Sequence, residues 1–201
     1  NTFILGDSTK LGGGIYISNS KDVRIKNTNI DGNSVSSGDS ETDGQGGGIY
    51  IKNSSVIITN THIANNESWD DENKGAAIYA VNSQVLIDSS YINNNRNNDL
   101  SSIGAGIYLK TEDGNIVDRS EVKNTEIIGN SSKTGPAIYL YKTPLLLERV
   151  IVSGNMTEGE ASGAIHTIDS KLYFLNCTIT ANTYSEGASS SGALYIDAAS
   201  P

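Results

Sequence analysis

Seven aromatic side chains recur through this chain at intervals of 27 to 34 residues, and they are its most regular candidates for chemistry. They are Tyr16, Tyr50, Tyr79, Tyr108, Tyr139, His166 and Tyr195. Tyrosine combines a large rigid ring with a polar tip and is enriched at interfaces, so the series is a candidate surface for a partner protein, a sister copy or a glycan. His166 adds acid–base chemistry, but a single His without an orienting partner is a poor catalyst. We therefore expect binding rather than catalysis here.

A second group of candidates is acidic. Nearly all of the net charge of −9 falls in six variable segments: 34–45, 67–74, 96–103, 131–134, 156–161 and 183–191. Clustered Asp and Glu oxygens suit Ca²⁺, yet their spacing fits neither an EF-hand loop nor a GGxGxDxUx repeat. We expect solvated loops and no cofactor or metal, with Ca²⁺ at the acidic loops left open. Trp69, in the most acidic segment, either stacks on a sugar ring or covers the edge of the coil.

The spacing of the aromatic series comes from a repeated unit. Each aromatic residue lies in a motif such as GGIYI at 13–17 or AGIYL at 105–109. Apolar residues alternate after the motif, as in VRI at 23–25, which is the period of a strand with one face inward. No stretch keeps the i, i+3, i+4, i+7 pattern of a helix. Residues 1–201 therefore predict one all-β domain, a parallel β-helix of about seven coils with three short strands each.

An asparagine follows an aliphatic residue by three positions in all six complete units. These residues are Asn33, Asn66, Asn95, Asn130, Asn155 and Asn182. Asparagine tolerates the left-handed conformation that tight corners use. Stacked amides can also bond to one another along the axis of stacked strands. We expect this set to be a structural ladder.

Strand alternation predicts where the aromatic series points. It places Ile15 and Ile17 on one face of the motif strand, and Gly14 and Tyr16 on the other. With the aliphatic residues in the core, the aromatic rings form an outward ladder with rungs ~4.8 Å apart. Beside it runs a ladder of small residues: Gly14, Gly48, Ala77, Gly106, Ala137, Ala164 and Ala193. Two interpretations stay open, namely that the stacked rings shield the sheet or that they form a recognition platform.

These motifs resemble the repeats of right-handed parallel β-helix proteins of the pectin-lyase-like class, and most closely those of chlamydial polymorphic membrane proteins. The latter carry a Gly-Gly-Ala-Ile-like and a Phe-x-x-Asn-like motif. The counterparts here are GGGI at 46–49, SGAI at 162–165, SGAL at 191–194, and ITAN at 179–182 with its five equivalents. The chain differs in having Ile or Val where Phe is usual. The resemblance covers the whole chain and implies the fold, because the matching residues are architectural.

Composition narrows the cellular setting. The net charge of −9 argues against nucleic-acid binding. No apolar run approaches the ~18 residues of a membrane helix, and no signal peptide is recognisable. Five N-x-S/T sequons, at Asn53, Asn66, Asn130, Asn155 and Asn176, permit a glycosylated extracellular protein. We therefore expect an extracellular or cell-surface location. We also expect a segment of a longer chain, since neither end shows a polar cap.

The remaining candidates favour a non-catalytic protein. The outward positions beside the tyrosines hold no carboxylate pair for glycoside hydrolysis, and Asp197 stands alone among them. His62 is expected on another face from His166, and Cys177 is expected to be a small core residue. The predicted function is an extracellular β-helical stalk or adhesin-type segment. The alternative is part of a carbohydrate-active β-helix enzyme (polysaccharide lyase, hydrolase or epimerase) whose catalytic residues lie outside this segment.

Overall fold

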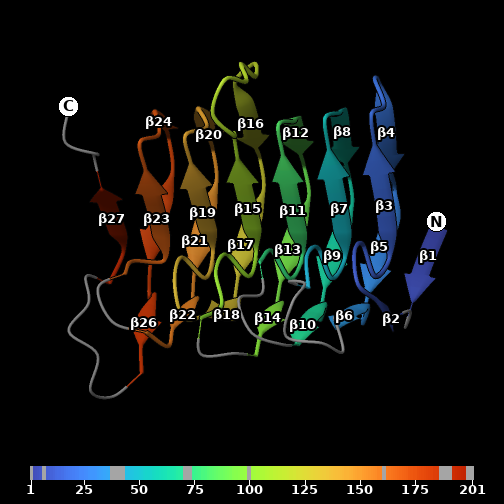
Figure 1. Ribbon diagram of the computed structural model, residues 1–201. Coiled ribbons are helices and arrows are strands. Elements are labelled where there is room, and N and C mark those ends of the chain that lie inside the picture. Colours follow the sequence, from blue (N-terminus) through green and yellow to red (C-terminus); the bar gives the residue numbers. More distant parts are fainter. Residues whose placement is uncertain are drawn as a thin grey trace.

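The computed structural model describes residues 2–5, 8–36, 44–69, 74–98, 101–159, 162–185 and 192–197. These residues form 27 strands and, within those ranges, no helix. The strands make four parallel sheets, and successive coils lie side by side along one axis (Figure 1). The structure confirms the expected all-β parallel β-helix.

The four sheets are named in chain order, starting from the strand of the first motif. The motif sheet holds β3 (Ile15–Ser18), β7 (Ile49–Lys52), β11 (Ile78–Val81), β15 (Ile107–Lys110), β19 (Ile138–Tyr141), β23 (Ile165–Ile168) and β27 (Leu194–Asp197). The second sheet holds β4 (Val23–Lys26), β8 (Ser55–Thr59), β12 (Gln84–Asp88), β16 (Ser120–Lys123), β20 (Leu145–Glu148) and β24 (Leu172–Leu175). The third sheet holds β1 (Thr2–Leu5), β5 (Thr28–Asp31), β9 (His62–Ala64), β13 (Tyr91–Asn93), β17 (Glu126–Ile128), β21 (Ile151–Ser153) and β25 (Thr178–Thr180). The fourth sheet holds β2 (Ser8–Thr9), β6 (Ser34–Ser36), β10 (Glu67–Trp69), β14 (Arg96–Asn97), β18 (Ser131–Ser132), β22 (Met156–Thr157) and β26 (Thr183–Tyr184).

Equivalent positions of the repeat pair with one another across the coils. In the motif sheet Ile15 pairs with Ile49 and Tyr16 with Tyr50, and the same register continues to β27. The inward aliphatic residues therefore stack on their own equivalents and fill one continuous core. Branched Ile and Val suit this position because their stiff side chains pack well on a pleated surface.

The fourth sheet corrects the prediction of three strands per coil. Its short strands occupy the first residues of the segments that the sequence presented as variable loops, such as β6 in 34–45 and β10 in 67–74. These strands lack the apolar alternation of the others, because their buried positions include Ser68, Asn97 and Ser132. The coil count differs slightly from seven, since the second sheet has six described strands and the other three sheets have seven.

The corners between the second and third sheets use left-handed backbone at residues that do not belong to the ladder. Asn27, Asn60, Asn124 and Asn176 have φ between 46° and 54° at this corner. At the next corner, between the third and fourth sheets, the left-handed residue is the one before the ladder asparagine, for example Asn65 or Asn94. The ladder asparagines do not themselves adopt positive φ, which corrects that part of the prediction.

The asparagine ladder is confirmed as a structural element. In each step the Nδ2 of one ladder residue donates to the Oδ1 of the next, at 2.9 to 3.0 Å, from Asn33 through to Asn182. The backbone N–H of the same residue donates to that oxygen too, as Asn66 does to Asn95. Each Nδ2 also reaches the carbonyl of an inward residue one coil back, such as Ile63 for Asn95. The ladder thus satisfies polar groups that are wholly buried at the corner.

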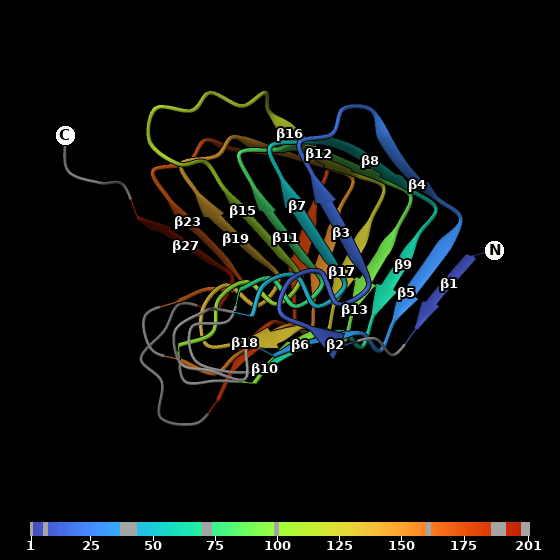
Figure 2. The same cartoon turned by 45° about the vertical axis from the view of Figure 1, so that its right-hand side comes forward.

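One corner is longer than its equivalents. The loop between β15 and β16 extends beyond the other corners in both views (Figure 2). Glu112 receives a hydrogen bond from Asn82 Nδ2 at 2.9 Å, and Asp113 pairs with Lys142 at 2.6 Å. These contacts attach the loop to the coils on either side.

Candidate functional site

The aromatic series forms one continuous stack, as predicted. Ring centroids of neighbouring members lie 4.6 to 5.4 Å apart, and their planes differ by 5° to 21°. The stack lies outside the main aliphatic core, in a second apolar cluster. Its members point away from the core, and that expectation is confirmed.

The stack is not an exposed strip, which corrects the prediction. Tyr50 is 5% exposed, Tyr139 and His166 are 7% exposed, and Tyr79 and Tyr108 are equally buried. Tyr16, on the first coil, is 54% exposed, and Tyr195 is half-buried. A broad recognition platform on the middle coils is therefore ruled out by burial, and the shielding interpretation holds there.

The cover over the stack comes from the residues just before each motif. Leu11 and Ile103 pack against the tyrosines, and bridges continue from Leu11 through Gln45, Lys74 and Ile103 to Thr134. A Cβ on Gly104 would lie 3.1 Å from the Cβ atoms of both Tyr108 and Tyr139. The glycine before the motif is thus needed for the chain to lie this close to the rings.

The small residues of the motif do not lie beside the tyrosines. Ala77, Ala137 and Ala164 belong to the main core, and a Cβ on Gly14 would lie 3.1 Å from the amide of Asn33. The strand begins one residue later than assumed, at Ile15, and residues 13 and 14 form a bend. Strict alternation therefore does not extend to this position. Gly14 and Gly48 face the ladder residues Asn33 and Asn66 instead.

Burial sets the ionisation of the stack. It raises the pKa of Tyr139 to about 12, with smaller contributions from Tyr141 and Asp197. Burial also lowers the pKa of His166 to about 4, and the carboxylate of Asp197 opposes this only in part. The Oγ of Ser162 lies 3.3 Å from Nδ1 of His166. His166 is thus a neutral ring inside the stack, and His62 lies on the third sheet, away from it, as expected.

The structure describes Trp69 but only part of the acidic segments. Trp69 ends β10 and is 48% exposed, but residues 70–73 and 37–43 of the acidic segments lie outside the described residues. The described part of the chain holds no group of three or more His, Cys, Asp or Glu side chains arranged to hold a metal. The two interpretations of Trp69 and the binding of Ca²⁺ by the loops stay untested.

The outer face of the third sheet carries a site that the sequence did not indicate. Two hollows of about 420 and 430 Å³ lie on it, and both are lined by His62, Tyr91 and Glu126. These residues belong to neighbouring strands β9, β13 and β17, in one row with register His62–Tyr91–Glu126. Tyr91 is 53% exposed, although the same residue type is buried in the motif sheet.

Local contacts fix the side chains of this site. His62 Nε2 lies 2.5 Å from Asn93 Oδ1, so Nε2 carries the proton because an amide oxygen only accepts. The rings of His62 and Tyr91 meet edge to face, with centroids 6.2 Å apart at 83°. Asn93 and Ile128 complete the first hollow. The result is a surface with an upright aromatic ring, a carboxylate, an imidazole and an amide.

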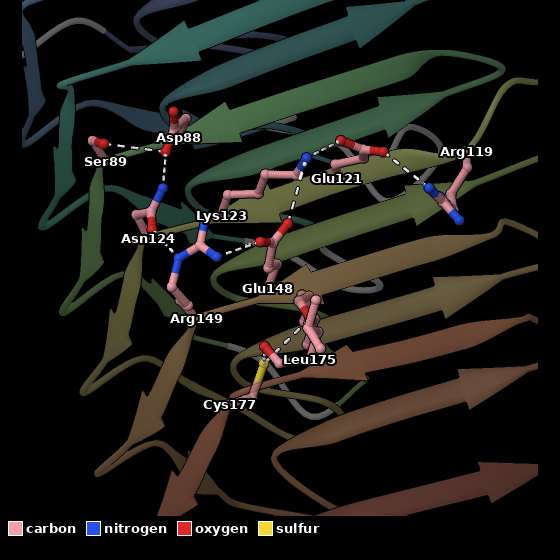
Figure 3. Close-up of polar contacts among 11 residues, drawn as sticks. Asp88, Ser89, Arg119, Glu121, Lys123, Asn124, Glu148, Arg149, Leu175 and Cys177 are labelled. Atoms are coloured by element: carbon pink, nitrogen blue, oxygen red, sulfur yellow. Dashed lines mark hydrogen bonds and ion pairs between the residues drawn. The ribbon is translucent and has the colours of Figure 1, made fainter.

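The wall of the second hollow is held by a network at the corner between the second and third sheets. Ser89 and Asn124 line this hollow. Asn124 Nδ2 donates to Asp88 Oδ1 at 2.7 Å, and Arg149 Nε donates to Asn124 Oδ1 at 2.7 Å (Figure 3). Arg149 also pairs with Glu148. The guanidinium is thus engaged at the corner.

A parallel set of ion pairs covers the outer face of the second sheet (Figure 3). Glu121 accepts from Lys123 at 2.7 Å and from Arg119 at 3.1 Å, and these cations hold the pKa of its carboxyl below the usual range. Lys123 also reaches Glu148 at 3.6 Å. All of these groups are partly exposed, so we ascribe little stability to them.

The sequons and the cysteine find structural explanations. Asn66, Asn130 and Asn155 are ladder residues with no exposed surface, so their sequons cannot carry a glycan in the folded chain. Asn53 and Asn176 are exposed. Cys177 is half-buried, packs against the main core and lies 3.3 Å from the carbonyl oxygen of Leu147, in agreement with a core role. No helix among the described residues is long and apolar enough to span a membrane.

Sequence reasoning missed the third-sheet site because it followed the repeat. The site residues occupy one outward position in each coil, just before the inward residues Ile63, Ile92 and Ile127. Their identities differ from coil to coil, so no motif marks them. The one signal in the sequence is Tyr91. It directly precedes the inward Ile92, so strand alternation places its aromatic ring on the outer face.

Comparison with known proteins agrees with this architecture. Neither the curated proteins nor the solved structures contain a match to the chain. The family described as the right-handed β-helix region matches residues 12–200. The chain therefore belongs to the right-handed β-helix family.

Proposed function

We propose that this chain is a non-catalytic, extracellular or cell-surface β-helical segment of the stalk or adhesin type that binds a glycan on the outer face of its third sheet. The observation that carries the proposal is the pair of hollows that meet at Tyr91. A half-exposed aromatic ring flanked by polar groups is suited to a sugar, whose C–H face packs on the ring and whose hydroxyls bond at its edges.

The lining of the hollows favours binding over catalysis. Glu126 is the single carboxylate among the described residues that line them. Hydrolysis of a glycosidic bond ordinarily requires two carboxyl groups on either side of that bond. The alternative of a carbohydrate-active enzyme rests on one observation, that Glu126 and His62 share both hollows and so place an acid and a base within one site.

The first prediction tests the proposed site with two matched tyrosines. Tyr91 and Tyr184 are 53% and 52% exposed, but Tyr184 lies on the fourth sheet. On an array of neutral and acidic glycans, Tyr91→Ala should weaken binding about tenfold or more, the loss expected for an aromatic anchor. Tyr184→Ala should bind like the unchanged chain.

Other results of this experiment would contradict the proposal in distinct ways. An array that retains no glycan would remove the glycan-binding function, and association of the chain with itself in light scattering would favour a sister copy as the occupant. Reducing ends or unsaturated products released from polysaccharides, and lost in Glu126→Gln, would instead establish an enzyme. Equal losses in both tyrosine variants would show that the third sheet is not the site.

A further inference from the structure

The charges around the two hollows limit what can bind there. The residues that line them include Glu126 and no lysine or arginine. The outward rows of the third sheet, from β5 to β25, are also without lysine and arginine: Asn29, His62, Tyr91, Glu126, Ile151 and Thr178 in one row, and Asp31, Ala64, Asn93, Ile128, Ser153 and Thr180 in the other. At the corner beside Asn124, Arg149 is bonded to Asn124 and Glu148, and Lys123 pairs with Glu121 and Glu148. An anionic ligand in the hollows would therefore meet the charge of Glu126 with no lysine or arginine among the lining residues.

The polar groups of the site suit hydroxyl groups. Nε2 of His62 donates to Asn93 and is already satisfied, and Glu126 offers two acceptor oxygens. Sugar hydroxyls supply the donors that these atoms need, whereas a carboxylate supplies none. The arrangement thus selects a donor-rich, uncharged ligand.

The apolar part of the site suits the flat face of a sugar ring. Tyr91 supplies apolar surface from one outward row, and Ile128 supplies it from the neighbouring row, which also holds Asn93. Neighbouring strands repeat every ~4.8 Å, a spacing comparable to the length of one pyranose unit, so a glycan running along the solenoid axis meets a new strand with each sugar. The two hollows share Tyr91, which allows consecutive sugars to contact one ring.

We infer that the site around Tyr91 takes consecutive uncharged sugar units of a glycan and discriminates against uronates. This inference rests on the proposed function, and it names the ligand class of the same site. Acidic polysaccharides, the substrates that a pectin-lyase-like fold suggests, are the class that the charges exclude.

Calorimetric titration with defined hexasaccharides tests the inference on the complete chain. Cellohexaose and N-acetylchitohexaose should bind, and hexagalacturonate should bind about tenfold more weakly at low ionic strength, where charge repulsion is least screened. Glu126→Gln should narrow the difference by improving uronate binding, because it removes the repelling charge. Glu121→Gln is the matched control, since it removes an equal charge from the outer face of the second sheet and should leave the ratio unchanged.

Each alternative outcome has a definite meaning. Binding of hexagalacturonate as tight as that of the neutral hexasaccharides would overturn the inference and leave the proposed glycan-binding function intact. An unchanged ratio in Glu126→Gln would also overturn it, because discrimination would then not arise at this carboxylate. Failure of every hexasaccharide and every arrayed glycan would remove the proposed function itself.

Discussion

Asparagine has two structural roles in this protein, one where its side chain is exposed and another where it is buried. At left-handed corners such as Asn60 the side chain faces solvent and the backbone conformation is what matters. In the ladder the backbone is ordinary and the amide is the functional group, buried and bonded at both ends. The same letter in the sequence thus marks two physical requirements.

The ladder should contribute strongly to stability. Asn95 accepts from the N–H and the Nδ2 of Asn66 and donates to Asn130 and to the carbonyl of Ile63. Asn95→Ala leaves these buried groups without partners, so we expect a loss of about 3–5 kcal/mol in the free energy of unfolding by urea. Asn115→Ala, in the exposed loop, should stay within about 0.5 kcal/mol of the unchanged chain. Similar small losses in both would show that water replaces the ladder amide at little cost.

His166 should make stability depend on pH. Its pKa in the folded chain, about 4, lies below the ordinary value of 6.5, so the native state binds fewer protons between these limits. Stability from the neutral ring is therefore complete above pH 6.5 and is lost as the pH falls towards 4, by roughly 1–3 kcal/mol.

Replacement by the residue of the other coils isolates this effect. His166→Tyr restores an uninterrupted tyrosine stack, and its free energy of unfolding should lack the part of the decline between pH 6.5 and 4 that belongs to the imidazole. The carboxylates titrate in both proteins, so the difference between the two curves reports His166 alone. Parallel curves would mean that the ring is protonated without penalty.

At the scale of the element, the motif strand is covered on both faces. Its aliphatic residues face the main core, and its tyrosines lie beneath the residues that precede the motifs, as Gly104 lies over Tyr108 and Tyr139. A strand buried on both sides has no free surface for recognition. The third sheet keeps its outer face open, because no segment crosses it among the described residues, and this difference locates the candidate site.

The cover should be sensitive to a single methyl group. Gly104 has φ of +62°, and a Cβ would lie 3.1 Å from the Cβ atoms of Tyr108 and Tyr139. Gly114 has φ of +80° and no atom within 4 Å of its Cβ position, so Gly114→Ala reports backbone strain alone. We expect Gly104→Ala to lower the melting temperature further than Gly114→Ala does. Overpacking should reduce the free energy of unfolding of Gly104→Ala by about 1–3 kcal/mol more than backbone strain alone. Equal effects would show that the cover can shift away from the rings.

At the scale of the whole molecule, the solenoid converts sequence repetition into rows. Each coil contacts mainly its neighbours, so a side chain repeated in every unit becomes a continuous structural element. A site with varied chemistry needs the opposite, namely different residues at one position of successive coils. His62, Tyr91 and Glu126 satisfy this condition. The rows that repeat most strictly are therefore architectural, whereas the candidate site lies on a row that varies from coil to coil.

The sequence by itself determined the parallel β-helix, the asparagine ladder and the stacking of the aromatic series, because each follows from a period that local alternation and neighbour pairing preserve. The tertiary structure alone decided that the tyrosines are buried, that a fourth short sheet closes each coil, and that the third sheet presents two hollows. Burial depends on which segment lies over a given face, as Gly104 lies over Tyr108 and Tyr139. Strand periodicity states only which side of its own strand a residue occupies, and it contains no information about what covers that side.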